Sequence, residues 1–280
     1  MTAARAPRSN RAKSSGGRTD PGALTVVKLG GSLLESGAFR NAAIEAIARR
    51  FAAGSPLVVV HGGGKRVDAF LSKMGIPKRI HRGLRVTDER TLDVVVAVLA
   101  GFVNKSLVGG LSAAGVPAAG LSGADGGTLR AEIHPPVDGV DLGRVGRVAS
   151  SDPRLVRALL GAGFLPVVAS VAIGPDSGLL NVNADAAASA LAAALGARRL
   201  VFFTDVEGVL DDRGRLIDRL GTDRARALLT SGVVTGGMLP KLAACLDAAA
   251  AGVAEIQIAG PSRHASVLAD GTGGTSLVAA

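Results

Sequence analysis

TVVKLGGS, residues Thr25–Ser32, begins with β-branched and apolar residues and ends in a glycine pair and a serine. Such a run is typical of a buried strand that opens into a tight turn at its carboxyl end. Glycine amides in that turn can approach phosphate oxygens closely, and Lys28 adds a positive charge beside them. The run therefore indicates a phosphate-binding turn. The alternative is an ordinary glycine turn between a strand and a helix, with a lysine that reaches the surface.

A second unit of the same kind follows. Leu57–Val60 (LVVV) is typical of a buried strand, and it leads through His61 and three glycines into a helix from about Arg66 to Met74. Parallel strands place their connecting turns, and hence their ligands, at the same edge of the sheet. The two units therefore predict an α/β fold with a mainly parallel sheet. A plain tight turn is again the alternative for the glycines.

Three later segments carry polar residues where a ligand would explain them. Arg85 precedes a helix that Thr87 or Asp88 can cap, and its guanidinium can bind a carboxylate with two hydrogen bonds. Asn181–Asp185 (NVNAD) opens an alanine-rich helix, and capping accounts for only one of its three polar residues. Val233–Lys241 (VVTGGMLPK) places a second glycine pair and a second isolated lysine at a helix start. A surface arginine, a capping aspartate and a solvated lysine are the alternatives.

Composition narrows the class of protein. The 280 residues carry a formal charge of +9 and include no Trp or Tyr and only 7 Phe, which argues against a surface that stacks on bases. Cys245 is the only cysteine, so neither an internal disulfide nor a cysteine metal cluster is possible, and a reducing cytoplasm is expected. No apolar stretch suggests a membrane span. Residues 1–24 are predicted to be a disordered basic tail without the apolar core of a signal peptide. Its cationic residues are Arg5, Arg8, Arg11, Lys13 and Arg18.

Familiar nucleotide motifs are missing. Gly64-Lys65 is followed by Arg66 rather than Ser or Thr, and no GxGxxG sequence opens a helix after a strand. The four histidines show no metal-ligand spacing. Phosphoryl transfer needs mainly positioning and positive charge, which glycine turns and two lysines can supply. Lys28 and Lys241 can approach the transferred group from two sides, with Asp185 between them. A carboxylate acceptor is already ionised, so no catalytic base is required.

The order of the motifs KLGGS, HGGG, GLRVTD, NVNAD, TDVEGVL and GGMLPK, from Lys28 to Lys241, resembles the amino acid kinase family. The resemblance covers about residues 25–280 and implies a three-layer α/β/α sandwich around a central, mainly parallel sheet. It implies that Lys28 and Lys241 stabilise the transition state and that Asp185 orients them. It further implies that the acylated amino acid is held by Gly63, Gly64, Arg85 and Asn181, with Arg85 on its α-carboxylate. The residues implied for the nucleotide are Gly30, Gly31, Asp205, Val206, Gly208, Val209, Leu210, Val233, Val234 and Thr235.

Within the family, the motifs are most similar to those of members that use ATP to phosphorylate the side-chain carboxylate of N-acetyl-L-glutamate in arginine biosynthesis. This implies a cytoplasmic enzyme with an N-terminal lobe, about residues 25–180, for the amino-acid substrate. A C-terminal lobe, about residues 181–280, would bind ATP. The phosphates themselves would largely hold Mg²⁺, so the resemblance gives no protein ligand for the metal.

Two departures from the family pattern leave alternatives open. Arginine-inhibited members share an apolar N-terminal helix that links dimers into hexamers, whereas the tail here is polar and basic, which favours a homodimer over a hexamer and leaves arginine feedback open. Residues 122–127 (SGADGG) also resemble the kinase that acts on carrier-protein-linked aminoadipate. A carrier-linked substrate and a non-catalytic amino-acid sensor therefore remain alternatives. Whether a nitrogen-signalling protein binds is left open.

Overall fold

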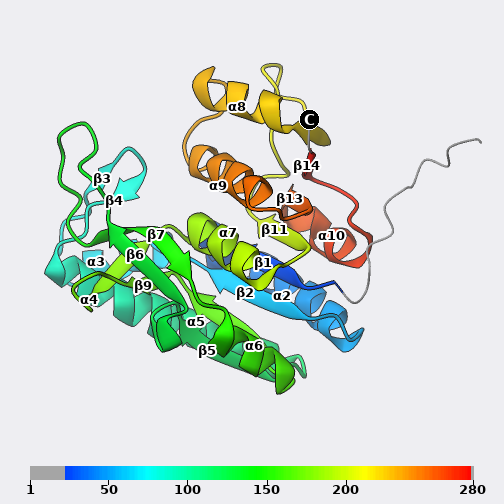
Figure 1. Cartoon of the computed structure of the whole chain (residues 1–280), viewed down its shortest axis with the longest axis horizontal. Coiled ribbons are helices and arrows are strands. Elements are labelled where there is room, and N and C mark those ends of the chain that lie inside the picture. Colours follow the sequence, from blue (N-terminus) through cyan, green and yellow to red (C-terminus); the bar gives the residue numbers. More distant parts are fainter. Residues whose placement is uncertain (1–22, 279–280) are drawn as a thin grey trace, which may run out of the picture.

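A central sheet of eight strands runs through the molecule (Figure 1). The computed structural model describes residues 23–278. Residues 1–22 of the predicted tail lie outside the described residues. In spatial order the strands are β12 (Arg219–Gly221), β14 (Thr275–Val278), β13 (Glu255–Ala259), β11 (Arg199–Phe203), β1 (Thr25–Leu29), β2 (Leu57–His61), β8 (Leu165–Ala169) and β5 (Ala118–Ser122). Neighbouring strands are parallel except β13 and β14, which are antiparallel. The predicted mainly parallel sheet is confirmed.

Helices cover both faces of this sheet. Successive strand residues point to opposite faces, and Val26 and Val27 accordingly belong to two different apolar cores. The first core is closed by α6 (Arg154–Gly161), α7 (Ala184–Leu195), α8 (Thr222–Thr230) and α9 (Met238–Ala250). The second core is closed by α1 (Gly31–Glu35), α2 (Gly37–Ala52), α3 (Gly64–Lys73), α4 (Glu89–Val96), α5 (Asn104–Ala113) and α10 (His264–Asp270). The three-layer α/β/α sandwich is therefore confirmed.

Glu89–Ala113, the longest helical segment that the structure describes, is mostly apolar. Between α4 and α5 lies the π-helical turn η1 (Ala97–Val103), and together they form a helical segment, Glu89–Ala113, with the length and composition of a membrane span. Val95, Leu99 and Leu107 on this segment are buried in the second core. Packing in the second core thus accounts for the apolar residues on the buried side of this segment.

The connections on the amino-terminal side build two small sheets beside the main one. A closed barrel is formed by β6 (Leu129–Ile133), β7 (Val145–Ser151), β9 (Val171–Ile173) and β10 (Leu179–Val182). A two-stranded ribbon is formed by β3 (Ile80–His81) and β4 (Leu84–Arg85), and two 3₁₀ turns are η2 (Asp125–Gly127) and η3 (Pro261–Arg263). The sequence does not predict the closure of the barrel, because β9 and β10 are too short to show a strand pattern.

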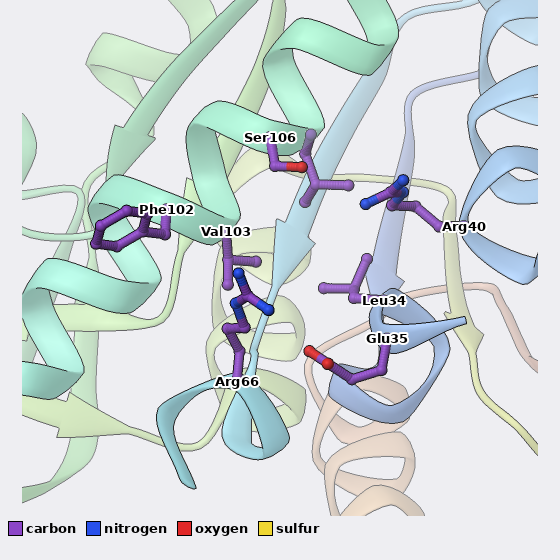
Figure 2. Close-up of a pocket in the computed structure, with 8 residues that line it drawn as sticks. Leu34, Glu35, Arg40, Arg66, Phe102, Val103 and Ser106 are labelled. Atoms are coloured by element: carbon purple, nitrogen blue, oxygen red, sulfur yellow. The ribbon is translucent and has the colours of Figure 1, made fainter. Parts of the chain in front are cut away.

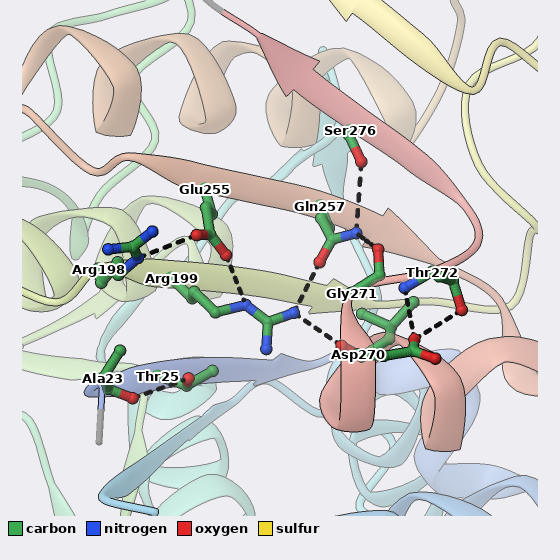
Figure 3. A network of polar contacts seen from close by, with 11 residues as sticks. Ala23, Thr25, Arg198, Arg199, Glu255, Gln257, Asp270, Gly271, Thr272 and Ser276 are labelled. Carbon is green, nitrogen blue, oxygen red and sulfur yellow. Dashed lines mark hydrogen bonds and ion pairs between the residues drawn. The ribbon is translucent and has the colours of Figure 1, made fainter. Parts of the chain in front are cut away.

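A polar network centred on the buried Arg199 joins β11 and β13 near their amino ends (Figure 3). Arg199, at the start of β11, is fully buried, and its Nη2 donates to Gln257 Oε1 at 2.9 Å and to Val267 O at 2.7 Å. Its Nε lies 3.1 Å from Glu255 Oε2 at the start of β13. Side chains and a backbone carbonyl of the chain itself therefore surround Arg199 at the start of β11, while the glycine turns lie at the carboxyl ends of the strands.

Candidate active site

The two predicted glycine turns face each other at the carboxyl edge of the sheet. Gly30 N donates to Phe203 O at the end of β11 at 3.0 Å, and Gly62 N donates to Leu29 O at the end of β1 at 3.4 Å. A Cβ on Gly31 would lie 3.0 Å from Gly64 N, closer than a side chain can approach without displacing its neighbour. The absence of a side chain at Gly31 therefore keeps open the space in front of the backbone amides of the second turn.

Both isolated lysines meet a single carboxylate beside these turns. Lys28 Nζ lies 2.8 Å from Asp185 Oδ1, and Lys241 Nζ lies 3.2 Å from the same oxygen. The three residues come from β1, the first turn of α7 and the first turn of α9, and each is at most 6% exposed. Two ammonium groups and one carboxylate leave a net charge of +1, which suits a site for a phosphoryl group.

The electrostatics of this cluster follow from its burial. Desolvation lowers the pKa of Lys28 to about 8; Asp185 opposes this shift and the like charge of Lys241 adds to it. Desolvation on its own raises the pKa of Asp185, but the two ammonium groups outweigh it, so the net pKa of that carboxyl is lowered. Asp185 is therefore ionised at neutral pH, while Lys28 can lose its proton in mildly alkaline solution.

The start of α7 fixes the position of Asp185. Asn183 Oδ1 accepts hydrogen bonds from the backbone N–H of Asp185 at 2.8 Å and of Ala186 at 3.1 Å, which makes Asn183 the cap of the helix. A carboxylate in the first turn also interacts favourably with the positive end of the helix dipole. Asn183 is thus the capping residue among the three polar residues of NVNAD.

A cavity of about 570 Å³ opens on one side of the lysine cluster. Its lining includes Lys28, Lys241 and Asp185, and every residue predicted for the nucleotide except Val209. The predicted residues on its wall are Gly30, Gly31, Asp205, Val206, Gly208, Leu210, Val233, Val234 and Thr235. This cavity joins the turn after β1 to the loop after β11 and the segment before α9.

Val209, in contrast, is buried in the core beneath that loop. It is 1% exposed, and its backbone N–H donates to Thr275 Oγ1 at 2.8 Å. Next to it, a Cβ on Gly208 would lie 2.5 Å from the same Thr275 oxygen and 2.6 Å from Leu216 Cδ1. Packing against β14 therefore requires glycine at 208 and gives Val209 a core position.

A second cavity, of about 250 Å³, opens on the other side of the cluster. All the residues predicted for the amino-acid substrate line it, namely Gly63, Gly64, Arg85 and Asn181. Five residues line both cavities, namely Lys28, Gly31, Gly83, Asn183 and Asp185. The lysine cluster therefore stands where the two cavities meet, so a group bound in each would face the other across it.

Arg85 is held ready for an anion by partners that sequence reasoning missed. Its Nη2 donates to Gly64 O at 3.1 Å and forms an ion pair with Asp68 on α3. Its Nη1 is buried and has no hydrogen-bond partner among residues 23–278. A buried guanidinium nitrogen without a partner is costly, and a substrate carboxylate would satisfy it. Nothing in the local sequence links Asp68 to Arg85, because they lie on different elements.

Asn181 is oriented by a similar contact. Its Nδ2 donates to Thr87 Oγ1 at 3.2 Å, and Thr87 Oγ1 donates in turn to Arg85 O at 2.8 Å. The amide oxygen and the second amide hydrogen of Asn181 are therefore the groups that can serve a ligand in the smaller cavity. The sequence suggests Thr87 only as a helix cap, whereas the structure assigns that role to Asp88, which accepts from Thr91 N at 2.8 Å.

Residues 122–127, which suggest a carrier-linked substrate, do not line either cavity. Asp125 Oδ2 accepts from the backbone N–H and the hydroxyl of Ser122, and a Cβ on Gly123 would lie 2.4 Å from Leu129 Cδ1. Turn closure and packing on β6 account for this segment.

A third cavity, of about 310 Å³, lies beside α1, α2, α3 and the π-helical turn η1 (Figure 2). Arg40, Arg66 and Glu35 line it together with apolar residues such as Leu34 and Phe102. It contains none of the predicted site residues. Among residues 23–278, no group of three or more His, Cys, Asp or Glu is arranged to hold a metal ion.

Comparison with known proteins agrees with this geometry. The model of the amino acid kinase family matches residues 23–260. The chain is 48% identical to the acetylglutamate kinase of Rubrobacter xylanophilus over 252 residues, which are 89% of this chain and 95% of that protein. It is 45% identical to the acetylglutamate kinase of Solibacter usitatus over 258 residues, 91% of this chain and 99% of the relative.

A solved structure shows the same fold. The crystal structure of smu.665 from Streptococcus mutans superposes with a TM-score of 0.77 at 28% identity, covering 91% of this chain and 98% of the other. The family model spans the glycine turns, both lysines and Asp185 in a single match. The chain therefore belongs to the amino acid kinase family.

Proposed function

We propose that this protein transfers the γ-phosphoryl group of ATP to the side-chain carboxylate of N-acetyl-L-glutamate. A carboxylate oxygen attacks the γ-phosphorus, the bond from that phosphorus to the β,γ-bridging oxygen breaks, and ADP leaves with the electron pair. The product is the acyl phosphate N-acetyl-L-glutamyl 5-phosphate, an intermediate of arginine biosynthesis. No proton has to be removed from the acceptor, because a side-chain carboxylate is ionised at neutral pH.

The observation that carries the proposal is the bridged lysine pair at the junction of the two cavities. Negative charge moves along the line of transfer as the phosphoryl group leaves ADP and reaches the acceptor. Lys28 and Lys241, both within 3.2 Å of Asp185 Oδ1, supply fixed positive charge along that line. Asp185 keeps the two like-charged ammonium groups close together in a buried site, where they would otherwise repel each other.

Each cavity takes one substrate in this proposal. ATP occupies the larger cavity, with its phosphates toward Lys28 and the amides of Gly30 and Gly31. N-acetyl-L-glutamate occupies the smaller one, with its α-carboxylate on Arg85 and its acetylated amide at Asn181. The lobe that binds the amino acid comprises about residues 25–180, and the lobe that binds ATP comprises about residues 181–280.

Mg²⁺ accompanies ATP in the proposed reaction. It neutralises phosphate charge and is held largely by the phosphate oxygens, as is usual for this ion. Asp205 is a carboxylate on the wall of the nucleotide cavity, which fits a Mg²⁺–nucleotide complex, but the proposal requires no protein ligand. We place the reaction in the cytoplasm, where ATP is available.

Acceptor dependence tests the proposed function. Purified protein would be incubated with ATP, Mg²⁺ and hydroxylamine, which traps acyl phosphates as hydroxamates. The acceptors would be N-acetyl-L-glutamate, L-glutamate, free aminoadipate and carrier-linked aminoadipate. We expect hydroxamate and ADP in equal amounts with N-acetyl-L-glutamate, and far less with the other acceptors. A rate independent of N-acetyl-L-glutamate, or a preference for the carrier-linked acceptor, would refute the assignment. Calorimetric binding of both ligands without turnover would instead indicate a sensor.

We also infer a homodimer rather than a hexamer, from the polar and basic character of residues 1–24. Sedimentation equilibrium measures the mass of the assembly directly. A mass of six chains would contradict this inference. Binding of a nitrogen-signalling protein stays a prediction without an assigned surface.

A further inference from the structure

A buried histidine stands directly behind the second glycine turn. His61, the last residue of β2, is fully buried, and its ring contacts polar atoms at both nitrogens. Nδ1 lies 2.9 Å from Gly62 O, and Nε2 lies 3.1 Å from Asn104 Nδ2. The side chain of His61 does not line either substrate cavity. Its position next to the glycines nevertheless connects it to the site.

The contacts of Gly62 and Asn104 determine which ring nitrogen of His61 carries the proton. Asn104 Nδ2 lies 2.8 Å from Val167 O and 3.2 Å from Leu121 O, and its Oδ1 accepts from Lys105 Nζ at 3.1 Å. Turning the amide round would place its oxygen against two carbonyl oxygens, so the nitrogen must face the strands and His61. Gly62 O can only accept, so the proton of the neutral ring is on Nδ1, which donates to it. Nε2 is then left as an acceptor that faces the Asn104 amide nitrogen, whose two hydrogens are shared among Val167 O, Leu121 O and Nε2.

That hydrogen bond fixes the plane of one peptide group. A peptide is planar, and in the trans form its C=O and N–H point in opposite directions; residues 23–278 contain no cis peptide. Holding Gly62 O against the His61 ring therefore directs the N–H of Gly63 away from that ring. A Cβ on Gly31 would lie 3.3 Å from Gly63 N, so this amide nitrogen lies next to the open space between the two glycine turns.

The same helical segment that supplies Asn104 also supports the turn by packing. A Cβ on Gly63 would lie 2.8 Å from Leu99 Cδ2 and 3.1 Å from Val103 Cγ2, both on the π-helical turn η1. Asn104 follows η1 immediately, and π-helical turns often occur at functional sites. Burial lowers the pKa of His61 to about 4, with the nearby charges of Lys105 and Lys28 contributing, so the ring is neutral at physiological pH.

We propose that His61 and Asn104 are positioning residues for phosphoryl transfer: Asn104 holds His61 as the Nδ1–H form, and His61 holds the Gly62–Gly63 peptide so that the Gly63 amide faces the phosphoryl group. Neither residue touches a substrate. The proposal rests on the proposed function, because it gives the Gly63 amide a negatively charged partner in the transition state. It adds two residues that no local motif identifies, since 43 positions separate them in the chain.

Two amide replacements of His61, each able to match one ring nitrogen, separate positioning from packing. In His61→Asn the side-chain nitrogen can take the place of Nδ1 and still donate to Gly62 O. In His61→Gln the amide can take the place of Nε2 and keep the contact with Asn104, but it loses the donor to Gly62. We expect His61→Asn to retain kcat within about threefold and His61→Gln to lose about 10- to 100-fold in kcat, as for a misplaced transition-state donor. KM for ATP should change little in either variant.

Thermal unfolding of both variants would be measured as the structural readout. A higher kcat in His61→Asn than in His61→Gln supports positioning, provided that His61→Asn does not also have the higher Tm. Equal kcat in the two variants, a kcat order that simply follows Tm, or a better Gln variant overturns the proposal. If wild-type protein phosphorylates no carboxylate at all, the proposed function itself has failed, and the variants would not be compared.

A second measurement reads the tautomer of His61 independently of activity. Imidazole ¹⁵N chemical shifts of the ¹⁵N-histidine-labelled wild-type chain report the tautomer of each of its four histidines. We expect a signal from a neutral ring with the proton on Nδ1 that does not titrate between pH 5.5 and 8.5 and that disappears in His61→Asn. An Nε2–H tautomer at His61, or a normal titration, overturns the proposal whatever the activity of the protein.

Discussion

Lys28 carries a charge in a place where desolvation opposes it. Its neighbour Asp185 favours the protonated form, while burial and Lys241 favour the neutral one, and the balance is a pKa of about 8. Only the protonated amine can stabilise the charge of a phosphoryl group. The residue therefore works close to the limit of its useful pH range, and the phosphates of bound ATP would extend that range by favouring the charged form.

The pH profile should show this limit. We expect kcat/KM for ATP, which reports the free enzyme, to fall as pH rises through about 8, and the corresponding limb in kcat to lie at higher pH. The free energy of unfolding should not fall over the same range. The pKa of Lys28 is below its ordinary value of 10.5, so between pH 8 and 10.5 this residue binds more protons in the unfolded state than in the folded state. Lys28 therefore favours the folded state increasingly as pH rises. Rate and thermal unfolding measured across pH 6–10 check both trends.

Asp185→Asn provides the matched control. Removing the carboxylate takes away the group that raises the pKa of Lys28, so any residual activity should fall at lower pH than in the wild-type enzyme. A wild-type kcat/KM that stays flat to pH 9.5, or a limb that does not move in Asp185→Asn, would show that Lys28 does not govern the profile.

Arg85 is the second residue with a distinct expected effect. Arg85→Lys keeps the positive charge but loses the planar pair of donors, including the buried Nη1, which has no hydrogen-bond partner within the described part of the chain. We expect KM for N-acetyl-L-glutamate to rise about 10- to 100-fold, corresponding to one lost hydrogen bond to a charged group, with KM for ATP unchanged. Arg82→Lys is the control, because Arg82 is exposed and pairs with Asp138 outside both cavities. Equal effects of the two substitutions would remove Arg85 from the substrate site.

At the scale of elements, the site depends on strand-to-helix turns that contain no side chains. Gly31 opens α1 and faces the amides of Gly63 and Gly64 at the start of α3. These amides belong to helix starts, where backbone N–H groups lack internal partners and the helix dipole favours an anion. The elements thus present donors to one space from two directions.

A methyl group at Gly31 tests this arrangement. Gly31→Ala should lower kcat at least about 100-fold, because its Cβ would lie 3.0 Å from Gly64 N in the space for the phosphoryl group. Gly37→Ala, at the start of α2, is the control: its Cβ would meet nothing within 4 Å, and alanine in a helix is favoured by up to about 1 kcal/mol. Kinetics and Tm of both variants give the answer. A Gly31→Ala enzyme as active as Gly37→Ala would contradict the role of the turn.

Some of these elements can be predicted from the sequence and others cannot. The strands that end in Leu29 and His61 are predicted from β-branched residues followed by glycines, because burial on both faces of a parallel sheet leaves a continuous apolar run. The closed barrel is not predicted, since its closure depends on strands of three and four residues. Likewise, the contact of His61 with Asn104 leaves no local signal, because it joins a strand end to a helix that the fold alone brings near.

At the scale of the whole molecule, one continuous sheet carries residues from both ends of the chain to the same edge. β1 and β2 are flanked on one side by β11 and β13 and on the other by β8 and β5. α7 and α9, which pack on one face, bring Asp185 and Lys241 to the end of β1. The sequence predicts that the two lysines meet at Asp185, partly from the order of the motifs. The distances between these groups, and the position of Lys28 and Asp185 on the walls of both cavities, are known only from the fold.

The central claim is that Lys28 and Lys241 together stabilise the phosphoryl group in transfer. Its most direct test is the rate of hydroxamate formation by wild type, Lys28→Ala and Lys241→Ala at saturating ATP and N-acetyl-L-glutamate. Lys73→Ala, on the exposed end of α3, serves as the control. We predict that each site variant loses about 10²–10³-fold in kcat while remaining folded, and that Lys73→Ala keeps the wild-type rate. A folded Lys28→Ala or Lys241→Ala enzyme with the wild-type kcat would contradict the account.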